Sequence, residues 1–273
     1  MEVRRRLQRE GIAFERLSRD QALQEIERWR SEHVPKIVAQ LKAAGFSLDW
    51  SRFRYTMDPG SVRATREVFV RLYEQGLIYR GERMVNWDVR LRTAISDLEV
   101  IHAEEEGHLY YLSYLAEDGG EGMVVATVRP ETIFGDVAVA VHPDDARYRS
   151  QIGRRVRVPL VERTVPVIAD PSVDPTFGAG ALKITPRHDP VDHEIAQRHP
   201  ELETPPDILD EEGRLTGPWV PADLRGRERE TARTLVVDRL KAAGRIGRIE
   251  PYRHSVARSE RSEAVIEPRL SRQ

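Results

Sequence analysis

The spacing of apolar residues changes along the chain, from a helical period near the start to strand-length runs in the middle. Residues 17–45 carry apolar side chains at helical spacing. Ser18 can act as the N-cap, Gly45 as the terminator, and Pro35 is expected to break or restart the helix. The pattern therefore predicts an amphipathic helix that is interrupted near its middle.

Two further segments have the helical period. One begins at Asp58 or Ser61, both of which are good capping residues, and ends at Gly76. The other lies within residues 223–246 and ends at Gly244.

Most of the remaining chain predicts short strands. Residues 108–220 contain apolar runs punctuated by proline and glycine, with Gly119 and Gly120 as a hairpin turn. One short helix, from Asp189 to about His199, interrupts these strands, and the last twenty residues are polar and expected to be irregular. The pattern predicts an α+β fold, in which a β-barrel-like domain with short helices follows a helical segment.

Four parts follow from these changes of pattern. They are a helical segment, connecting strands, a β domain and a C-terminal connecting segment, at residues 1–75, 76–107, 108–250 and 251–273.

Composition excludes several classes of protein. The chain has 273 residues, of which 40% are apolar and 32% charged, and no apolar run reaches the length of a membrane helix. It has no cysteine, which excludes disulfides and cysteine-bound zinc, and we expect a cytoplasmic protein. A net charge of −2 gives no field that would draw the whole molecule onto nucleic acid, although arginine greatly outnumbers lysine.

The first chemically suggestive segment is "ALKITPRHDPVDHEIAQRH", residues 181–199. Lys183 and Thr185 lie on one side of a predicted strand, and the helix that follows begins with Asp189 and Asp192. Both aspartates could simply organise the helix N-terminus, where carboxylates are favourable. The same group of side chains could instead bind a small ligand that carries an amine and hydroxyl groups.

Histidines in this segment do not have the spacing of a metal site. His188, His193 and His199 are five and six residues apart, which is neither the i, i+4 spacing of a helical zinc site nor H-E-x-x-H. Exposed or capping histidines are the favoured interpretation. A metal-dependent hydrolase using His188, His193 and Asp189 is the least favoured of the possible functions.

Two other segments attract attention. In "ATVRPETIFGD" a strand ends at Thr127, and Pro130 holds Arg129 in an extended conformation before the turn. This could be a surface Arg–Glu pair, or a rim that presents hydroxyl groups and a guanidinium to a ligand. In "DPTFGAGALK" the glycines at 178 and 180 suggest a close backbone approach, without the order of a phosphate-binding loop.

Together these segments resemble the editing (connective insertion) domain of the valyl-tRNA synthetases, which are class I enzymes. The resemblance follows the chain in order and nearly end to end, through "MVNWDVRLRTAISDLEV", "TVRPETIFGDVAVAVHP" and "GALKITPRHDPVDHEIAQRH". The His-Asp-Pro-x-Asp run is similar to the valyl branch rather than to the isoleucyl and leucyl patterns. Residues 1–75 would then resemble part of the nucleotide-binding domain.

The resemblance implies a post-transfer editing hydrolase, an aminoacyl-tRNA deacylase that cleaves the ester of mischarged Thr-tRNA(Val). It implies catalytic roles for Asp189, Asp192 and Lys183. It also implies substrate-binding roles for a second set of residues, which comprises Arg129, Phe177, Thr185, Thr127, Glu131 and Thr132. Its partner would be the tRNA(Val) 3′ end carrying threonine.

Departures from the family pattern limit what is expected. The H-I-G-H and K-M-S-K-S signatures are absent, so aminoacylation and ATP use are not expected. "DVRL" stands at 88–91 where some members carry C-P-x-C, so neither a metal nor another cofactor is expected. Arg187 stands where alanine is usual, and it could close the pocket mouth or contact a phosphate.

We interpret the chain as a monomeric segment of a longer enzyme that does not bind membranes, although a stand-alone remnant stays possible on sequence grounds. The alternative function is a non-catalytic tRNA-binding or structural remnant of a synthetase that has lost aminoacylation.

Overall fold

The computed structural model describes residues 2–273, apart from the side chain of Glu15, and divides them into two units. The first unit ends at Tyr79 and the second begins at Arg80.

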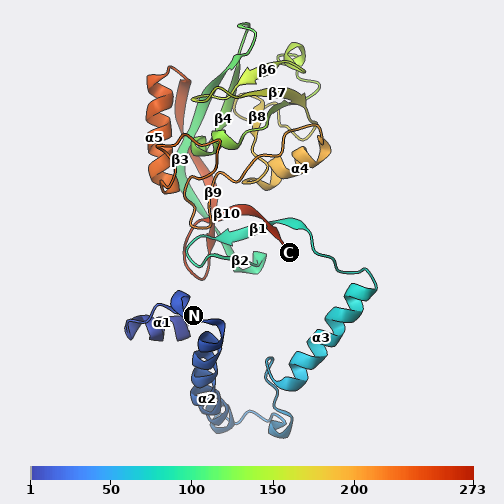
Figure 1. Ribbon diagram of the computed structural model, residues 1–273, viewed down its shortest axis with the longest axis vertical. Coiled ribbons are helices and arrows are strands. Elements are labelled where there is room, and N and C mark those ends of the chain that lie inside the picture. The colour runs from blue at the N-terminus through green and yellow to red at the C-terminus, as the bar shows by residue number, and fades with distance from the viewer. Residues whose placement is uncertain (1) are drawn as a thin grey trace. The chain divides into compact units, whose positions relative to one another are not determined.

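The first unit is helical. Its elements are α1 (Glu2–Arg9), η1 (Phe14–Arg16), α2 (Arg19–Ala43), η2 (Trp50–Arg52) and α3 (Pro59–Glu74) (Figure 1). Neither α2 nor α3 has a buried residue.

The predicted boundaries of α2 are confirmed, but its predicted interruption is wrong. Ser18 forms a capping box with Gln21, and Gly45 follows the helix with a φ of +80°. The helix runs unbroken through Pro35. Proline removes one N–H donor, and the bonds of the long flanking segments hold the rest of the helix in register.

The two candidate starts of α3 are resolved in favour of Asp58. Its carboxylate accepts a hydrogen bond of 2.7 Å from the Ser61 backbone N–H, and Pro59 occupies the first helical position. Gly76, with a φ of +69°, follows the helix as expected.

The second unit contains two sheets. The smaller has the order β10-β1-β2, formed by β1 (Glu82–Asp88), β2 (Thr93–Ile95) and β10 (Ile266–Arg272), and η3 (Asp97–Glu99) follows β2.

The larger sheet has the order β4-β3-β6-β7-β5-β8, and β9 pairs with β3 outside this path. Its strands are β3 (Val100–Ala116), β4 (Met123–Thr127), β5 (Ala138–Val141), β6 (Arg155–Arg157), β7 (Thr164–Ala169), β8 (Ala181–Ile184) and β9 (Ile246–Ser259). The connections contain η4 (Pro130–Gly135), η5 (Arg149–Gln151), α4 (Pro190–Arg198) and α5 (Arg229–Ala242). Pairing is antiparallel except between β5 and β7.

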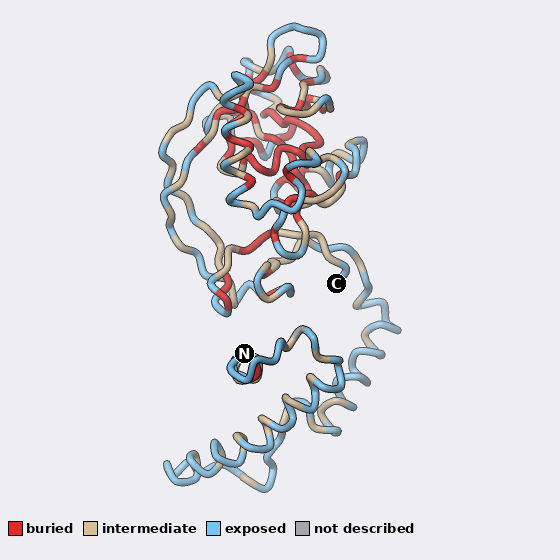
Figure 2. The backbone as a smooth tube through the Cα atoms, turned by 60° about the vertical axis from the view of Figure 1, so that its left-hand side comes forward, coloured by how far each residue is buried: buried red, intermediate tan, exposed pale blue. Residues whose placement is uncertain are grey.

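The α+β prediction is confirmed, although the pairing among the described residues runs from β4 to β8 without closing a barrel. Helix α5 contacts η4 and β9, while α4 contacts β8 on the other side of the sheet (Figure 1). The buried residues gather within this sheet and against α5, as the red segments of Figure 2 show.

The prediction of an irregular C-terminal segment is wrong. The last twenty residues contain the end of β9 and all of β10. Strand β9 pairs with β3 and β10 pairs with β1, both antiparallel and both distant in sequence. Their many polar residues conceal a strand pattern, because these ribbons are only partly buried.

Candidate functional site

Strand β8 and helix α4 position the first group of predicted residues. Lys183 and Thr185 lie on the same side of the strand, and the Lys183 Nζ donates a 2.6 Å hydrogen bond to the Thr185 Oγ1. The backbone N–H of Thr185 in turn donates to the Asp192 Oδ2 at 2.7 Å. The end of the strand and the first turn of the helix are thereby joined, and all three side chains are buried.

A fourth buried group, Asp136, completes this network from the C-terminal side of η4. The Thr185 hydroxyl donates to the Asp136 Oδ1 at 2.7 Å, and the Tyr114 hydroxyl donates to the Oδ2 at 2.5 Å. The Lys183 Nζ lies 3.6 Å from the same carboxylate. Burial raises the pKa of Asp136 above its usual value, while the Lys183 charge opposes the rise.

Asp192 is the second carboxyl group in the network, and its pKa is also raised. Burial, followed by the nearby charge of Asp189, raises its pKa to about 8, although Lys183 and the Thr185 N–H favour the ionised form. A pKa of about 8 favours the protonated form of the Asp192 carboxyl group at neutral pH.

Asp189 is the N-cap of α4. One of its oxygens accepts hydrogen bonds from the backbone N–H groups of Val191 at 2.9 Å and Asp192 at 3.2 Å. Its charge also lies close enough to Arg129 to favour the ionised guanidinium. The Asp189 carboxylate thus caps the helix and also acts electrostatically on Arg129.

Arg129 connects this junction to η4. Its Nη1 donates to the His188 carbonyl oxygen at 3.1 Å. The Thr127 Oγ1 accepts from the Arg129 backbone N–H at 3.0 Å, and the Thr132 hydroxyl donates to its carbonyl at 2.9 Å. Both threonines therefore hold the Arg129 backbone.

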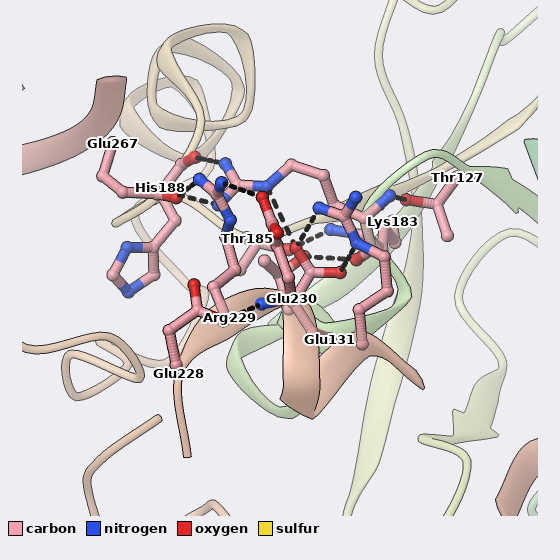
Figure 3. Close-up of polar contacts among 12 residues, drawn as sticks. Thr127, Glu131, Lys183, Thr185, His188, Glu228, Arg229, Glu230 and Glu267 are labelled. Atoms are coloured by element: carbon pink, nitrogen blue, oxygen red, sulfur yellow. Dashed lines mark hydrogen bonds and ion pairs between the residues drawn. The ribbon is translucent and has the colours of Figure 1, made fainter. Parts of the chain in front are cut away.

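Arg129 also belongs to a buried ionic cluster whose other members come from η4, α5 and β10, and Figure 3 labels Glu131, Arg229 and Glu267 among them. Glu131 accepts two 2.8 Å hydrogen bonds from Arg233 and lies 3.6 Å from the Arg129 Nε. Glu267 forms ion pairs with both Arg129 and Arg229. Glu131 is fully buried, and its carboxylate contacts the guanidinium groups of Arg129 and Arg233.

Phe177 lies in the loop between β7 and β8. Its side chain is 44% exposed, and its ring meets the Tyr252 ring edge-on with centroids 6.0 Å apart. The next residue, Gly178, has a φ of +57°, and a Cβ there would lie 2.5 Å from the Ala126 Cβ. The close backbone approach that the two glycines suggested is confirmed at this position.

His188 departs from the sequence interpretation, because it is neither exposed nor capping. Its side chain is only 2% exposed, and its Nε2 accepts a hydrogen bond of 3.1 Å from the Ile208 backbone N–H. Burial, and then the charge of Arg129, lower its pKa to about 3. Among residues 2–273, no group of three or more histidine and acidic side chains could hold a metal ion.

Arg187 forms an ion pair with Asp207, a residue of the loop that follows α4. Arg269 of β10 approaches the same carboxylate at 3.7 Å. The His188–Ile208 hydrogen bond fastens the adjacent position of this loop. Through these contacts Arg187 attaches the loop to the turn between β8 and α4.

Several residues of this site were not found from the sequence: Asp136, Tyr114, Arg229, Arg233 and Glu267. Asp136 had a usable signal, since it is a single acidic residue between "TIFG" and "VAVAV", where any carboxylate would be buried. The others come from α5, β10 and the C-terminal end of β3, and only the tertiary fold brings them to η4.

The second unit is thus an α+β domain with a buried polar network at the β8–α4 junction. Residues 1–271 match the family model of the class I tRNA synthetases (I, L, M and V), and the chain belongs to this family.

The most detailed similarity is to valine–tRNA ligases. The chain is 46% identical over 273 residues to the valine–tRNA ligase of Legionella pneumophila (strain Lens), and 45% identical to that of Streptococcus pyogenes serotype M1. These alignments include 99% of this chain but only 29% and 30% of the two relatives. The chain thus spans under a third of the length of the curated relatives it matches.

No helix among the described residues has both the length and the apolar character needed to cross a membrane.

Proposed function

We propose that the β8–α4 junction is a hydrolytic editing site that removes threonine from mischarged tRNA(Val). The observation that carries this proposal is the buried Asp192 carboxyl group, which lies beside Lys183 and Thr185 and has a pKa of about 8. Similarity to valine–tRNA ligases supports the identity of the substrate.

Recognition would rest on the polarity of the pocket. The Asp192 carboxylate would accept hydrogen bonds from the ammonium and hydroxyl groups of threonine. Valine has a methyl group in place of the hydroxyl and would leave a buried acceptor without a partner, which costs about 1–3 kcal/mol. A hydrophobic synthetic pocket cannot strongly reject an isostere that adds only a hydroxyl, a general result for which valyl-tRNA synthetase is itself the usual example.

Hydrolysis would proceed by attack of water on the ester carbonyl carbon. The bond from this carbon to the ribose oxygen breaks, and the proton lost by the water goes to that oxygen, releasing threonine and a free ribose hydroxyl. Lys183 would stabilise the negative charge that develops on the carbonyl oxygen. Its ammonium group has three N–H donors, of which one is directed to Thr185 and a second faces Asp136. The third donor would then be available to the substrate.

Placement of the terminal adenosine would fall to the second group of predicted residues. Arg129 contacts the junction through the His188 carbonyl oxygen, and Phe177 would add its exposed ring. Thr127, Thr132 and Glu131 would act by holding Arg129, since their polar groups contact its backbone or guanidinium.

A paired deacylation assay tests the proposal. The chain should release threonine from Thr-tRNA(Val) at least ten times faster than valine from Val-tRNA(Val), and Asp192→Asn should abolish that preference. Glu194→Gln, an exposed neighbour on the same helix, is the matched control and should leave it unchanged.

Release without any preference for threonine, at high protein concentration, would refute the proposal. Binding of a non-hydrolysable threonyl-adenosine without turnover of the tRNA would favour the non-catalytic module instead.

A further inference from the structure

Arg163 contacts the C-terminal end of η4 from a different part of the sheet. It lies between β6 and β7, as the residue before Thr164. Its Nη2 donates a 2.9 Å hydrogen bond to the Phe134 carbonyl oxygen, and its Nη1 donates to the Asp136 carbonyl oxygen. The last carbonyl groups of a helix have no partner within the helix, so one guanidinium here supplies two donors that η4 itself lacks.

Trp219 restricts the orientation of this guanidinium group. The Arg163 Cζ lies over the Trp219 ring, 4.0 Å from its centroid, which is a cation–π contact. The indole packs in turn against the hydrophobic cluster that includes Ile184 of β8 and Ile195 of α4. Because the N–H groups of a guanidinium lie in its plane, a ring over its face leaves its edge free to donate to η4.

The same end of η4 contacts Thr185 in two ways. The Asp136 Oδ1 accepts a 2.7 Å hydrogen bond from the Thr185 hydroxyl. A Cβ on Gly135 would lie 2.8 Å from the Thr185 Cγ2 and 3.1 Å from the Ile208 Cδ1, so only a glycine lets the backbone come this close. A displacement of this end of η4 would therefore move Thr185, and with it Lys183, which donates to the Thr185 Oγ1.

The charge of Arg163 also acts on the Asp136 carboxylate. Burial raises the pKa of Asp136, and the charges of Lys183 and then Arg163 oppose the rise. Four further groups face one or other member of the Arg163–Asp136 pair, namely Tyr114, Thr185, Asp192 and Glu203. Removal of the Arg163 charge should consequently raise the pKa of Asp136 further.

We propose that Arg163 and Trp219 are positioning residues of the candidate site, which hold the end of η4 against Thr185 and so set the place of the Lys183 ammonium group. Arg163 acts through the backbone of η4, and Trp219 acts through Arg163. The proposal rests on the proposed function in that the reaction affected is the deacylation of Thr-tRNA(Val).

Deacylation kinetics of the full chain test the positioning role. Arg163→Lys keeps the charge but replaces the planar fork by one ammonium group, so the paired hydrogen bonds to η4 should be lost. The kcat for Thr-tRNA(Val) should fall about tenfold while KM stays within about twofold, because a misplaced Lys183 affects the chemical step. Arg157→Gln is the matched control, since Arg157 lies on the adjacent strand β6 and pairs with the exposed Glu162, and it should change neither value.

Substitutions at Trp219 separate the contact with Arg163 from general packing. Trp219→Leu keeps an apolar side chain but removes the ring over the guanidinium, and kcat should fall about threefold. Trp219→Phe restores a ring and should recover most of that loss.

A titration provides a measurement that does not depend on hydrolysis. In the NMR titration of labelled aspartate, Arg163→Gln should move the Asp136 transition to higher pH by about one pH unit, and Arg163→Lys should move it less. A residue that only stabilised the fold would lower the free energy of unfolding in urea and leave this transition in place.

Equal kcat values for the parent chain and Arg163→Lys, or an unmoved Asp136 transition in Arg163→Gln, would overturn the proposal. If Arg163→Gln does not fold, the kinetics of Arg163→Lys and Trp219→Leu decide. If the parent chain releases no threonine, the proposed function fails, and the Asp136 transition still decides whether Arg163 acts on this network.

Discussion

At the scale of single residues, Asp192 is unusual because its position favours the protonated form while its predicted task requires the ionised form. Its pKa of about 8 is set first by burial and then by Asp189. A ligand with an ammonium group would reverse this preference, so binding and proton release should be coupled.

Binding of a non-hydrolysable threonyl-adenosine amide should consequently depend on pH. Below pH 8 the free protein carries the Asp192 proton, which the ligand must displace, so affinity should rise by up to about tenfold per pH unit from pH 6 toward 8. Above about pH 8 the ligand amine loses its own proton and affinity should fall again. Isothermal titration calorimetry in buffers of different ionisation enthalpy should show proton release near pH 7.

Asp192→Asn provides the control for that measurement. The amide has no titration in this range, so its weaker binding should be flat between pH 6 and 7.5 and should release no proton. A parent chain whose affinity is equally flat would exclude Asp192 as the partner of the amine.

The residue scale also shows what the sequence could and could not reveal about the site. Lys183, Thr185, Asp189 and Asp192 could be grouped from the sequence because they lie within ten positions of one another at a strand–helix junction. The hydrogen bond from the Thr185 hydroxyl to the Asp136 carboxylate could not be predicted from the sequence. Asp136 reaches the junction only because β5 pairs with β8.

At the scale of elements, the start of α4 combines a helix cap with an electrostatic effect on two neighbouring side chains. Asp189 caps the helix through two backbone N–H groups, and its charge acts on both Asp192 and Arg129. The sequence left cap and site as alternatives, and the geometry makes them compatible.

Two substitutions at Asp189 separate these roles. Asp189→Ala removes the cap and should lower the free energy of unfolding by about 1 kcal/mol, whereas Asp189→Asn keeps a good cap and should leave stability nearly unchanged. Both remove the negative charge next to Asp192, so both should lower the pKa of that carboxyl group. Urea unfolding gives the first quantity, and NMR titration of labelled aspartate gives the second.

If Asp189→Asn also left the titration of Asp192 unchanged, Asp189 would be a cap and nothing more.

Elements with local signals were predicted well, and elements that depend on distant partners were not. The helix caps at Ser18, Asp58 and Asp189 and the Gly119 turn follow from short-range chemistry. Strands β9 and β10 have few apolar residues, and they become strands only by pairing with β3 and β1. The wrong prediction of a break at Pro35 has the opposite cause. A residue that locally disfavours the helix is accommodated because the helix on both sides of it is long.

At the scale of the whole molecule, the two units differ in how much they bury. The unit that begins at Arg80 holds the main hydrophobic core, whereas α2 and α3 have no buried residue and α3 exposes Phe69 and Tyr73. A unit with so little buried apolar surface has little free energy to oppose the entropy of its chain.

Separate expression of the two units should therefore give different results. Residues 80–273 should unfold cooperatively with a midpoint within a few degrees of the parent chain and should bind the threonyl-adenosine amide with equal affinity. Residues 1–79 should retain some helix by circular dichroism but melt without a clear transition. A cooperative melt of the short piece, or loss of binding by the long one, would contradict this division.

Strand β3 pairs with β4 through a short hairpin, but its other long edge pairs with β9, from Val100↔Ser259 to Leu112↔Ile246. During synthesis more than a hundred further residues must be added after β3 before β9, the partner of this edge, leaves the ribosome. Until then its N–H and C=O groups are available to other chains. The same pairing makes folding depend on closure of a very long loop, so β3 should acquire protection from hydrogen exchange late, in a single step with β9.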